Sequence, residues 1–129
     1  MEFPANLRYS KEHEWLLVED GIVTIGITDH AQDALGDIVY IGDLPEEGDE
    51  VEQEDVIGVI ESVKATTDLF APVGGTVKEL NEALDDAPET INESPYGDGW
   101  VLKLEMASAD ELGDLMDAEA YQKLIAEES

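Results

Sequence analysis

The chain has 129 residues, is 43% hydrophobic and contains no cysteine. This predicts one domain with its own core, and it excludes disulfides, thiol nucleophiles and thiolate metal sites. The 33 acidic and 6 basic residues give a formal net charge of −27, which disfavours binding to nucleic acid phosphates. Neither a basic, apolar leader nor a run of about 18 apolar residues is found. We therefore expect a soluble cytoplasmic protein without a signal peptide or a membrane span.

The acidic residues are spread along the whole chain, where they interrupt regular apolar patterns instead of replacing them. So high a net charge destabilises a compact state at low salt through self-repulsion. At about 1 M salt the Debye length falls to about 3 Å, which relieves this repulsion. We interpret the composition as an adaptation to the salt-filled cytoplasm of an extreme halophile. Disorder caused by net charge fits less well, because the apolar patterns are intact.

Short strands and turns account for the first third of the chain. Asp20 and Gly21 form a turn signal that suits a tight hairpin. Thr28 or Asp29 can cap a short helix, which Gly36 can end with a positive φ. The expected elements are a polar lead-in at residues 1–11, strands at 13–18 and 22–27, a helix at 28–36 and a strand at 37–41.

The rest of the chain continues as strands and then becomes helical. Turns rich in glycine or proline separate the strands, and no long helix interrupts them, which is typical of a β barrel or sandwich. Ser108 and Glu111 have the spacing of a capping box, and Asp117 can cap a further helical piece. The expected elements are strands at 51, 56–61, 67–70, 76–80 and 100–104, an irregular segment at 81–99 and helical segments between 108 and 125.

Lys64 lies at the predicted tip of the hairpin formed by residues 56–61 and 67–70. A prosthetic arm needs a primary amine at an exposed and rigid tip, where a modifying enzyme can reach it. The small neighbours Ser62 and Ala65 suit such a tip. General principles favour an ordinary solvated lysine, but they do not exclude an attachment site. The residue pattern by itself therefore leaves both interpretations open.

The other polar residues of interest have simpler interpretations. His13 and His30 are predicted to be structural or exposed, because no further nitrogen or sulfur ligands are spaced for a metal site. Glu12 and Glu14 are interpreted as part of a solvated strand face. No arrangement of a nucleophile and a base is evident, so the pattern offers no positive evidence for an enzyme.

Several long motifs, in the right order, resemble the H protein of the glycine cleavage system. The resemblance covers about residues 7–125, nearly the whole chain. It implies a mainly β fold, a barrel-sandwich hybrid like that of lipoyl and biotinyl domains, with short helices and a C-terminal helix. It also implies a single lipoyl-carrier domain over residues 1–129. The motifs lie at residues 25–40, 61–65, 73–77, 81–84 and 91–100.

The resemblance implies a non-catalytic carrier in which Lys64 bears lipoic acid in amide linkage. Such a carrier takes the aminomethyl group of glycine from a pyridoxal-phosphate glycine dehydrogenase, the P-protein, to an aminomethyltransferase, the T-protein. Dihydrolipoamide dehydrogenase, the L-protein, reoxidises the arm, and a lipoate ligase or lipoyl transferase installs it. The resemblance implies no catalytic residue, no metal, no nucleic acid and no membrane.

The resemblance also implies a surface cleft into which the loaded arm folds back. The polar groups that contact the cargo amine in this family map onto Glu14 and Asp68. A carboxylate in a partly dry cleft holds a cation better than it does in water. Glu12, which falls where some members have a serine, is the third expected contact of the arm. Glu54 stands where many members have a glycine, so we expect an altered turn there.

Two other functions remain open at this point. One is an H-like protein that donates lipoyl groups to other complexes. The other is an enzyme that uses His13 or His30 with Glu14. A biotin carrier is disfavoured, because such carriers place methionine on both sides of the lysine, where this chain has Val63 and Ala65.

Overall fold

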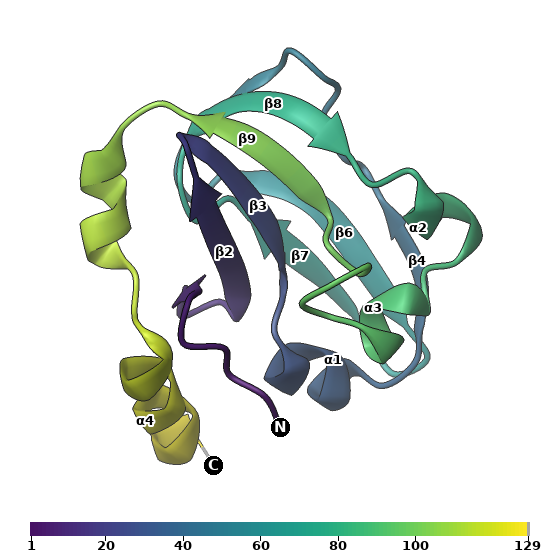
Figure 1. Ribbon diagram of the computed structural model, residues 1–129. Coiled ribbons are helices and arrows are strands. Elements are labelled where there is room, and N and C mark those ends of the chain that lie inside the picture. Colours follow the sequence, from purple (N-terminus) through teal and green to yellow (C-terminus); the bar gives the residue numbers. More distant parts are fainter. Residues whose placement is uncertain (129) are drawn as a thin grey trace.

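The computed structural model describes residues 1–128, which form two antiparallel sheets packed face to face (Figure 1). The larger sheet has the strand order β1-β2-β3-β9-β8-β5, and the smaller has the order β4-β6-β7. This confirms the mainly β, barrel-sandwich prediction. The strands are β1 (Arg8–Tyr9), β2 (Glu14–Glu19), β3 (Ile22–Ile27), β4 (Ile38–Gly42), β5 (Glu50–Val51), β6 (Val56–Ser62), β7 (Thr66–Phe70), β8 (Gly75–Leu80) and β9 (Leu102–Met106).

Short helices connect or cover the sheets. They are α1 (Asp29–Leu35), α2 (Ala83–Asp86), α3 (Thr90–Glu93), the 3₁₀ helix η1 (Ala109–Asp114) and α4 (Ala118–Glu128). In Figure 1, α1 lies at one end of the sandwich, and α4 lies beside the N-terminal segment. Within residues 1–128, no helix has both the length and the apolar character that crossing a bilayer requires.

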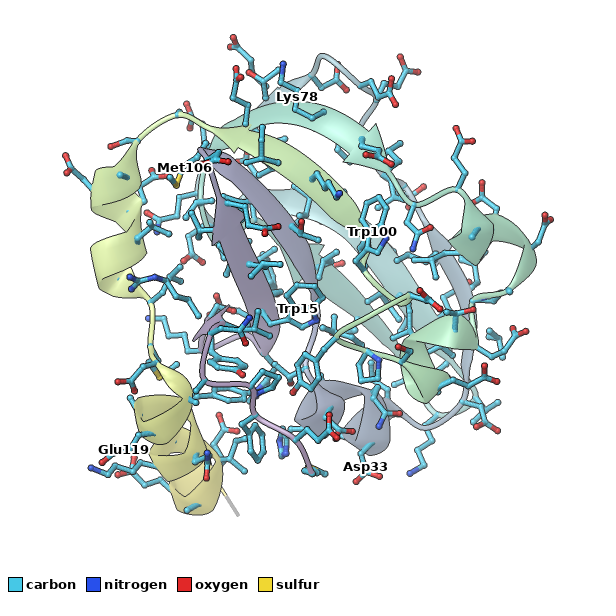
Figure 2. All side chains as sticks on the ribbon, in the orientation of Figure 1. Trp15, Asp33, Lys78, Trp100, Met106 and Glu119 are labelled. Atoms are coloured by element: carbon cyan, nitrogen blue, oxygen red, sulfur yellow. The ribbon has the colours of Figure 1, made fainter. Side chains whose placement is uncertain are left out.

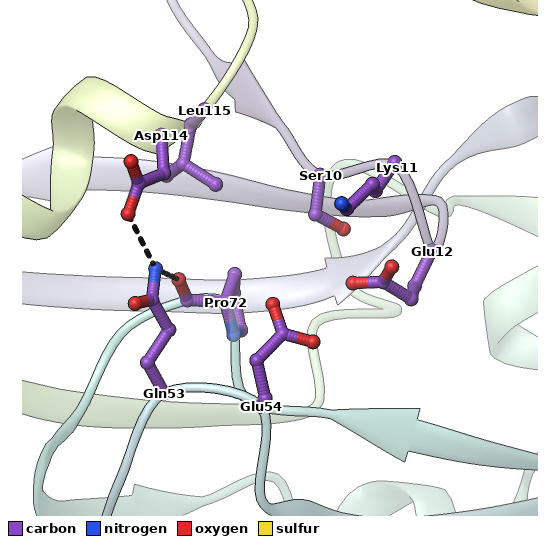
Figure 3. Close-up of a pocket in the computed structure, with 8 residues that line it drawn as sticks. All are labelled: Ser10, Lys11, Glu12, Gln53, Glu54, Pro72, Asp114 and Leu115. Atoms are coloured by element: carbon purple, nitrogen blue, oxygen red, sulfur yellow. Dashed lines mark hydrogen bonds between the residues drawn. The ribbon is translucent and has the colours of Figure 1, made fainter.

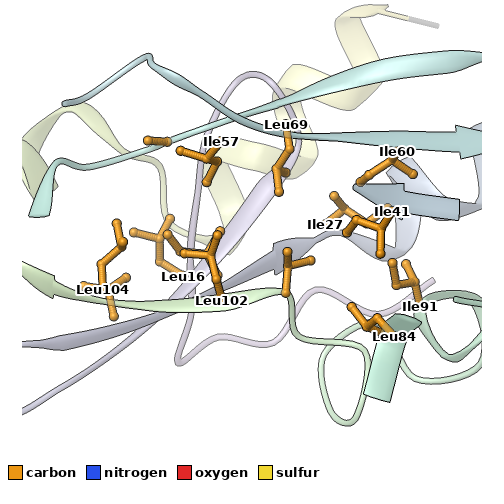
Figure 4. Close-up of a cluster of buried hydrophobic side chains, with 14 of the residues drawn as sticks. Leu16, Ile27, Ile41, Ile57, Ile60, Leu69, Leu84, Ile91, Leu102 and Leu104 are labelled. Atoms are coloured by element: carbon orange, nitrogen blue, oxygen red, sulfur yellow. The ribbon is translucent and has the colours of Figure 1, made fainter. Parts of the chain in front are cut away.

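The main core fills the space between the two sheets. Leu16 and Leu102 from the larger sheet face Ile57 and Leu69 from the smaller one, and each is at most 1% exposed (Figure 4). Burying a side chain of this size contributes about 1.5–3 kcal/mol. These contacts fix how the smaller sheet, which contains Lys64, sits on the larger one.

A second hydrophobic cluster lies between the N-terminal segment and α4. Tyr9 and Tyr121 are fully buried, and their rings stack in parallel with centroids 4.7 Å apart. Phe3 packs edge-on against Tyr121 at 5.8 Å. Leu7 and Trp15 complete the buried part of this cluster. The predicted polar lead-in was therefore wrong, because its apolar side chains are buried by a helix that lies more than 100 residues away.

Two turn predictions are confirmed by the backbone. Asp20 and Gly21 have φ values of 51° and 82°, the left-handed pair that a tight two-residue hairpin needs. Thr28 caps α1, and its Oγ1 accepts a hydrogen bond from Ala31 N at 3.1 Å. Gly36 ends the helix with φ 79°.

Some predicted boundaries and caps were wrong. The strand expected from residue 13 begins at Glu14, because His13 has φ 71° and belongs to a turn. The final strand is Leu102–Met106, so it begins two residues later than predicted.

The predicted capping box at Ser108 does not form, and the segment is a 3₁₀ helix. Ser108 Oγ accepts from Asp110 N at 3.3 Å. The carboxylate of Glu111 accepts from Gly74 N at 2.7 Å, so a tertiary contact replaces the local one. Asp117 does cap α4, since its Oδ1 accepts from Ala120 N at 2.8 Å.

Glu54 adopts the left-handed conformation that a glycine would adopt freely. Its φ is 75°, and its N–H donates to Ala71 O at 2.8 Å. A non-glycine residue in this region costs roughly 1–2 kcal/mol. The turn before β6 thus keeps a positive φ despite the side chain, and the loop accommodates the cost.

The surface is strongly acidic. Figure 2 shows carboxylate side chains that project outward around the molecule, including the labelled and exposed Asp33 and Glu119. Within residues 1–128, three lysines form surface ion pairs, and each such pair contributes about 0–1 kcal/mol. They are Lys78–Glu105 at 3.7 Å, Lys103–Glu79 at 4.0 Å and Lys123–Glu119 at 3.6 Å.

Candidate functional site

Lys64 is exposed at the tip of the β6–β7 hairpin, as the sequence predicted. The Ser62 hydroxyl accepts hydrogen bonds from Lys64 N at 3.2 Å and from Ala65 N at 3.1 Å. Val63 N donates to Asp37 O at 3.0 Å, which ties the tip to the segment before β4. The Lys64 amine forms no ion pair within residues 1–128. The backbone of the tip is therefore fixed, while the amine remains available.

The stem of Lys64 lies against the end of α1. A carbon at the Cβ position of Gly36 would lie 3.5 Å from Lys64 Cε and 3.7 Å from Lys64 Cδ. Leu35, the residue before Gly36, lines the neighbouring cleft. The end of α1 thus connects the lysine to the rim of that cleft.

The cleft has a volume of about 190 Å³ and lies between α1, β7 and the turn before β2. It brings together Glu12, Glu14 and Asp68, the three residues that the resemblance implied as arm contacts. Its lining combines apolar and polar side chains in equal number. The apolar lining is Ile27, Ala31, Ala34, Leu35, Ile60 and Leu69, and the other polar lining residues are His13, His30 and Thr67.

Glu14 is 1% exposed, which corrects its interpretation as a solvated strand residue. Its Oε1 accepts from Ser10 Oγ at 2.5 Å, and its Oε2 accepts from Phe70 N at 3.2 Å. Burial raises the pKa of Glu14 to about 7, although these two hydrogen bonds oppose the shift. At neutral pH the carboxyl group is therefore poised between its two protonation states.

Asp68 and Glu12 are more accessible than Glu14. Asp68 is exposed on β7, where it pairs with Val59 of β6. Partial burial and the nearby Glu54 raise the pKa of Glu12, while Lys11 opposes the shift. The three carboxyl groups therefore share one cleft but differ in solvation.

A second hollow of about 310 Å³ adjoins the cleft and shares Glu12 with it (Figure 3). In Figure 3 the carboxylates of Glu12 and Glu54 face each other across this hollow. Gln53 Nε2 donates to Asp114 Oδ2 at 3.3 Å and to Pro72 O at 3.2 Å. This hollow is larger than the cleft, but its lining is mainly polar and charged.

A hydrogen-bonded network supports one side of the cleft. His13 Nδ1 lies 2.8 Å from the Tyr121 hydroxyl, which lies 2.7 Å from Thr28 Oγ1. His13 Nε2 lies 3.3 Å from Glu128 Oε2. Burial is the main cause that lowers the pKa of His13, which favours the neutral imidazole. The ring of His30 lies next to that of His13, with centroids 5.0 Å apart.

The family model for the glycine cleavage H-protein matches residues 7–128 of the chain. The chain belongs to the glycine cleavage H-protein family. A glycine cleavage system H protein from Chromohalobacter salexigens is 55% identical over 126 residues, covering 97% of this chain and 95% of that protein. The one from Thermotoga maritima is 51% identical over 121 residues, covering 94% and 97%.

The fold agrees with this family. The crystal structure of a glycine cleavage system H protein from Mycobacterium marinum matches with a TM-score of 0.89 at 36% identity. The match covers 96% of this chain and 99% of that one. The function of the chain is therefore that of a lipoyl carrier in the glycine cleavage system, and the chain is not itself a catalyst. The relay and enzyme alternatives are not favoured.

Sequence reasoning missed the residues that support the H-protein cleft from a distance. Tyr121 lies 93 positions from Thr28 and 108 from His13. Ser10 was assigned to a featureless lead-in, yet it is 4% exposed and bonded to Glu14. The sequence predicted only that the segment containing Tyr121 is helical, which does not indicate a partner for its side chain.

Proposed function

We propose that Lys64 bears the lipoyl group in amide linkage and that Glu14, Asp68 and Glu12 receive the cationic cargo of the arm. The single observation that carries this proposal is the Lys64 tip itself. Its backbone is held by Ser62, and its amine is exposed without an ion pair within residues 1–128. A modifying enzyme can reach such an amine, and the tip holds it in a constant position.

The cleft suits the far end of an arm attached at Lys64. The lysine stem lies over Gly36, and the cleft begins at Leu35, so the arm has a continuous path along the end of α1. The volume of about 190 Å³ is below the ~300 Å³ of pockets that bury drug-sized ligands. We therefore expect the cleft to hold only the end of the arm. When bound, the lipoyl group supplies the disulfide and thiol chemistry that accepts the aminomethyl cargo.

The carboxyl groups supply the recognition of that cargo. Glu14 lies buried with two hydrogen bonds and no cationic partner within residues 1–128. A cation that enters the cleft favours the ionised form of a carboxyl group, which compensates for the desolvation of Glu14. Asp68 adds a second, solvated charge at the same cleft. Cargo docking is thereby coupled to the release of a proton from Glu14.

A carrier with this arm needs four partners. We propose that they are the glycine dehydrogenase P-protein, the aminomethyltransferase T-protein, the dihydrolipoamide dehydrogenase L-protein, and a lipoate ligase or lipoyl transferase. We place the protein in the cytoplasm with them. The net charge of −27 argues against nucleic acid as a further partner.

Lys64→Arg tests the attachment site. Arginine keeps the positive charge but offers no amine that can form the amide, so the variant should carry no lipoyl group and transfer no aminomethyl cargo. Its unfolding temperature should be unchanged, because the amine forms no ion pair with any of residues 1–128. Intact mass, peptide mapping and glycine decarboxylation with added P-protein are the three measurements.

Lys78→Arg is the matched control, since Lys78 is also exposed on a strand of the sandwich. It should be lipoylated and active like the parent protein. A lipoyl group found on any lysine other than Lys64, or retained transfer by Lys64→Arg, would contradict the proposal.

We further infer that the acidic surface is an adaptation to high salt, consistent with an origin in an extreme halophile. The charge of −27 is mostly unpaired, so screening should stabilise the fold. The unfolding temperature should rise steadily from low salt to molar KCl. A flat or falling unfolding temperature, measured by differential scanning calorimetry, would exclude this inference.

A further inference from the structure

His13, His30 and Glu128 come from three separate parts of the chain and meet at the edge of the cleft. His13 belongs to the turn before β2, His30 to α1 and Glu128 to the end of α4. One ring nitrogen from each histidine and one carboxylate oxygen all lie within 4.8 Å of one another. The two histidines are half-buried and Glu128 is exposed, so the group is open to ions from solution.

The donor set fits a divalent transition metal. Two imidazoles and one carboxylate with an open fourth position form a common zinc site, with Zn–N and Zn–O bonds of about 2.0–2.2 Å. Ligand atoms of such a tetrahedron lie about 3.3 Å apart. His13 Nε2 and Glu128 Oε2 are already 3.3 Å apart. All three ligand atoms lie within 4.8 Å of one another, so the wider separations must shorten to about 3.3 Å when an ion binds.

The surroundings of His13 also fit a metal ligand. If a metal takes Nε2, then Nδ1 must carry the hydrogen. Tyr121 lies 2.8 Å from Nδ1 and can accept that hydrogen, while its own hydroxyl donates to Thr28 Oγ1 at 2.7 Å. Ligating histidines are usually held in this way by a partner on the second nitrogen, which fixes the ring orientation. Tyr121 is fully buried, so it holds this position firmly.

We propose that His13 Nε2, His30 and Glu128 form a binding site for Zn²⁺ at the edge of the arm cleft. This site uses none of Lys64, Glu14 or Asp68, so it is independent of the attachment proposal. The net charge of −27 would concentrate cations around the protein and favour occupancy.

A bound ion would connect three segments that the chain brings together only through tertiary packing. α4 would then be joined to α1 and to the turn before β2 by coordination bonds. Because His13 and His30 line the cleft, the ion would fix the side of the cleft that these two residues form. Zn²⁺ should therefore raise the unfolding temperature, and EDTA should reverse the rise.

The test is a titration of the full-length Lys64→Arg variant with ZnCl₂, because this variant lacks arm thiols that would bind the metal. The titration is done at about pH 7.5, where histidine is mainly neutral, and in about 1 M KCl, which screens the surface carboxylates. Calorimetry gives the stoichiometry, and ¹⁵N spectra of the imidazoles identify the ligands. We expect one Zn²⁺ per chain and simultaneous shifts of the His13 and His30 signals.

Variants distinguish binding of Zn²⁺ at this site from general attraction of the ion to the acidic surface. Glu128→Gln should weaken binding by about tenfold or more, and His30→Asn should weaken it further. Glu127→Gln is the matched control, because Glu127 is an exposed carboxylate on the same turn of α4, and it should leave the affinity unchanged. The titration is then repeated with the lipoylated parent protein.

Three results would overturn the proposal. The first is binding of several ions without a response of the imidazole signals. The second is an equal loss of affinity in Glu127→Gln and Glu128→Gln. The third is unchanged binding in His30→Asn. Any of them would show that the contacts among these three residues do not form a zinc site.

Discussion

The Lys64 hairpin and the supports of the cleft are held by different kinds of contact. At the hairpin, Ser62 bonds to Lys64 and Ala65, which are two and three positions away. In the cleft supports, Glu14 bonds to Phe70 across 56 positions, and Tyr121 bonds to His13 across 108. One part of the site is held mostly by contacts that are local in sequence, and the other depends on the complete fold.

Attachment of the arm at Lys64 and protection of its cargo in the cleft therefore depend on different parts of the fold. Local contacts can hold an exposed lysine at a constant position even when distant parts of the chain loosen. The cleft requires the N-terminal segment, β7, α1 and α4 to meet, so it should be lost first when tertiary packing is weakened. Substitutions in the supports should therefore affect mainly stability and cargo retention, while those at the tip should affect mainly modification.

The largest effect is expected at Tyr121. Tyr121→Ala removes a fully buried ring that stacks on Tyr9 and should lower the free energy of unfolding by about 3–5 kcal/mol. Tyr121→Phe keeps the ring but deprives Thr28 and His13 of a hydrogen bond, which should cost about 1–3 kcal/mol. Denaturant unfolding in molar KCl measures both.

Lys64→Ala is the reference for that experiment, and it should change stability by less than about 0.5 kcal/mol. The comparison between the two regions would fail if Lys64→Ala and Tyr121→Phe were equally destabilising. It would also fail if Tyr121→Ala left the free energy of unfolding unchanged.

An intermediate effect is expected from the titration of Glu14. Its folded pKa of about 7 lies above the unfolded value of about 4.3. The stability that its protonated form supplies is fully present below about pH 4.3 and is lost as pH rises through about 7. Between pH values of about 5 and 8.5, Glu14 should therefore cost the fold about 2–3 kcal/mol.

Glu14→Gln removes this titration, so its free energy of unfolding should fall less over that pH range than that of the parent protein. The free energy of unfolding of both proteins is measured at both pH values, in molar KCl with EDTA. Subtracting one protein from the other cancels the titration of the surface acids, which both proteins share. An identical pH dependence in both proteins would show that Glu14 is not perturbed by burial.

The smallest stability effect is expected at the hairpin. Ser62→Ala removes the hydroxyl that accepts from Lys64 N and Ala65 N, and should cost about 0.5–1.5 kcal/mol. Its rate of lipoylation should fall more clearly than its stability, because the tip loses its fixed geometry. Ser62→Thr keeps the hydroxyl and should restore the rate. Equal lipoylation rates in the alanine and threonine variants would contradict this role.

Much of the fold was predictable because its signals are short-range. The Asp20–Gly21 turn and the Thr28 cap were read correctly, since each depends on residues a few positions apart. β1 was missed, and η1 was predicted as a helical segment but with a capping box that does not form. Tyr9 looks like part of a polar segment until α4 covers it, and Glu111 bonds to Gly74 instead of to its own helix.

The sequence by itself determined the sandwich of short strands, the exposed lysine tip and the acidic surface, because strand periodicity, turn chemistry and net charge are properties of neighbouring residues or of composition. Only the tertiary structure decided that Glu14 is buried with a raised pKa. It alone placed His13, His30 and Glu128 together. The physical reason is that burial of a side chain and the clustering of several side chains both depend on tertiary contacts. Such contacts join segments far apart in the sequence, and no local sequence pattern predicts them.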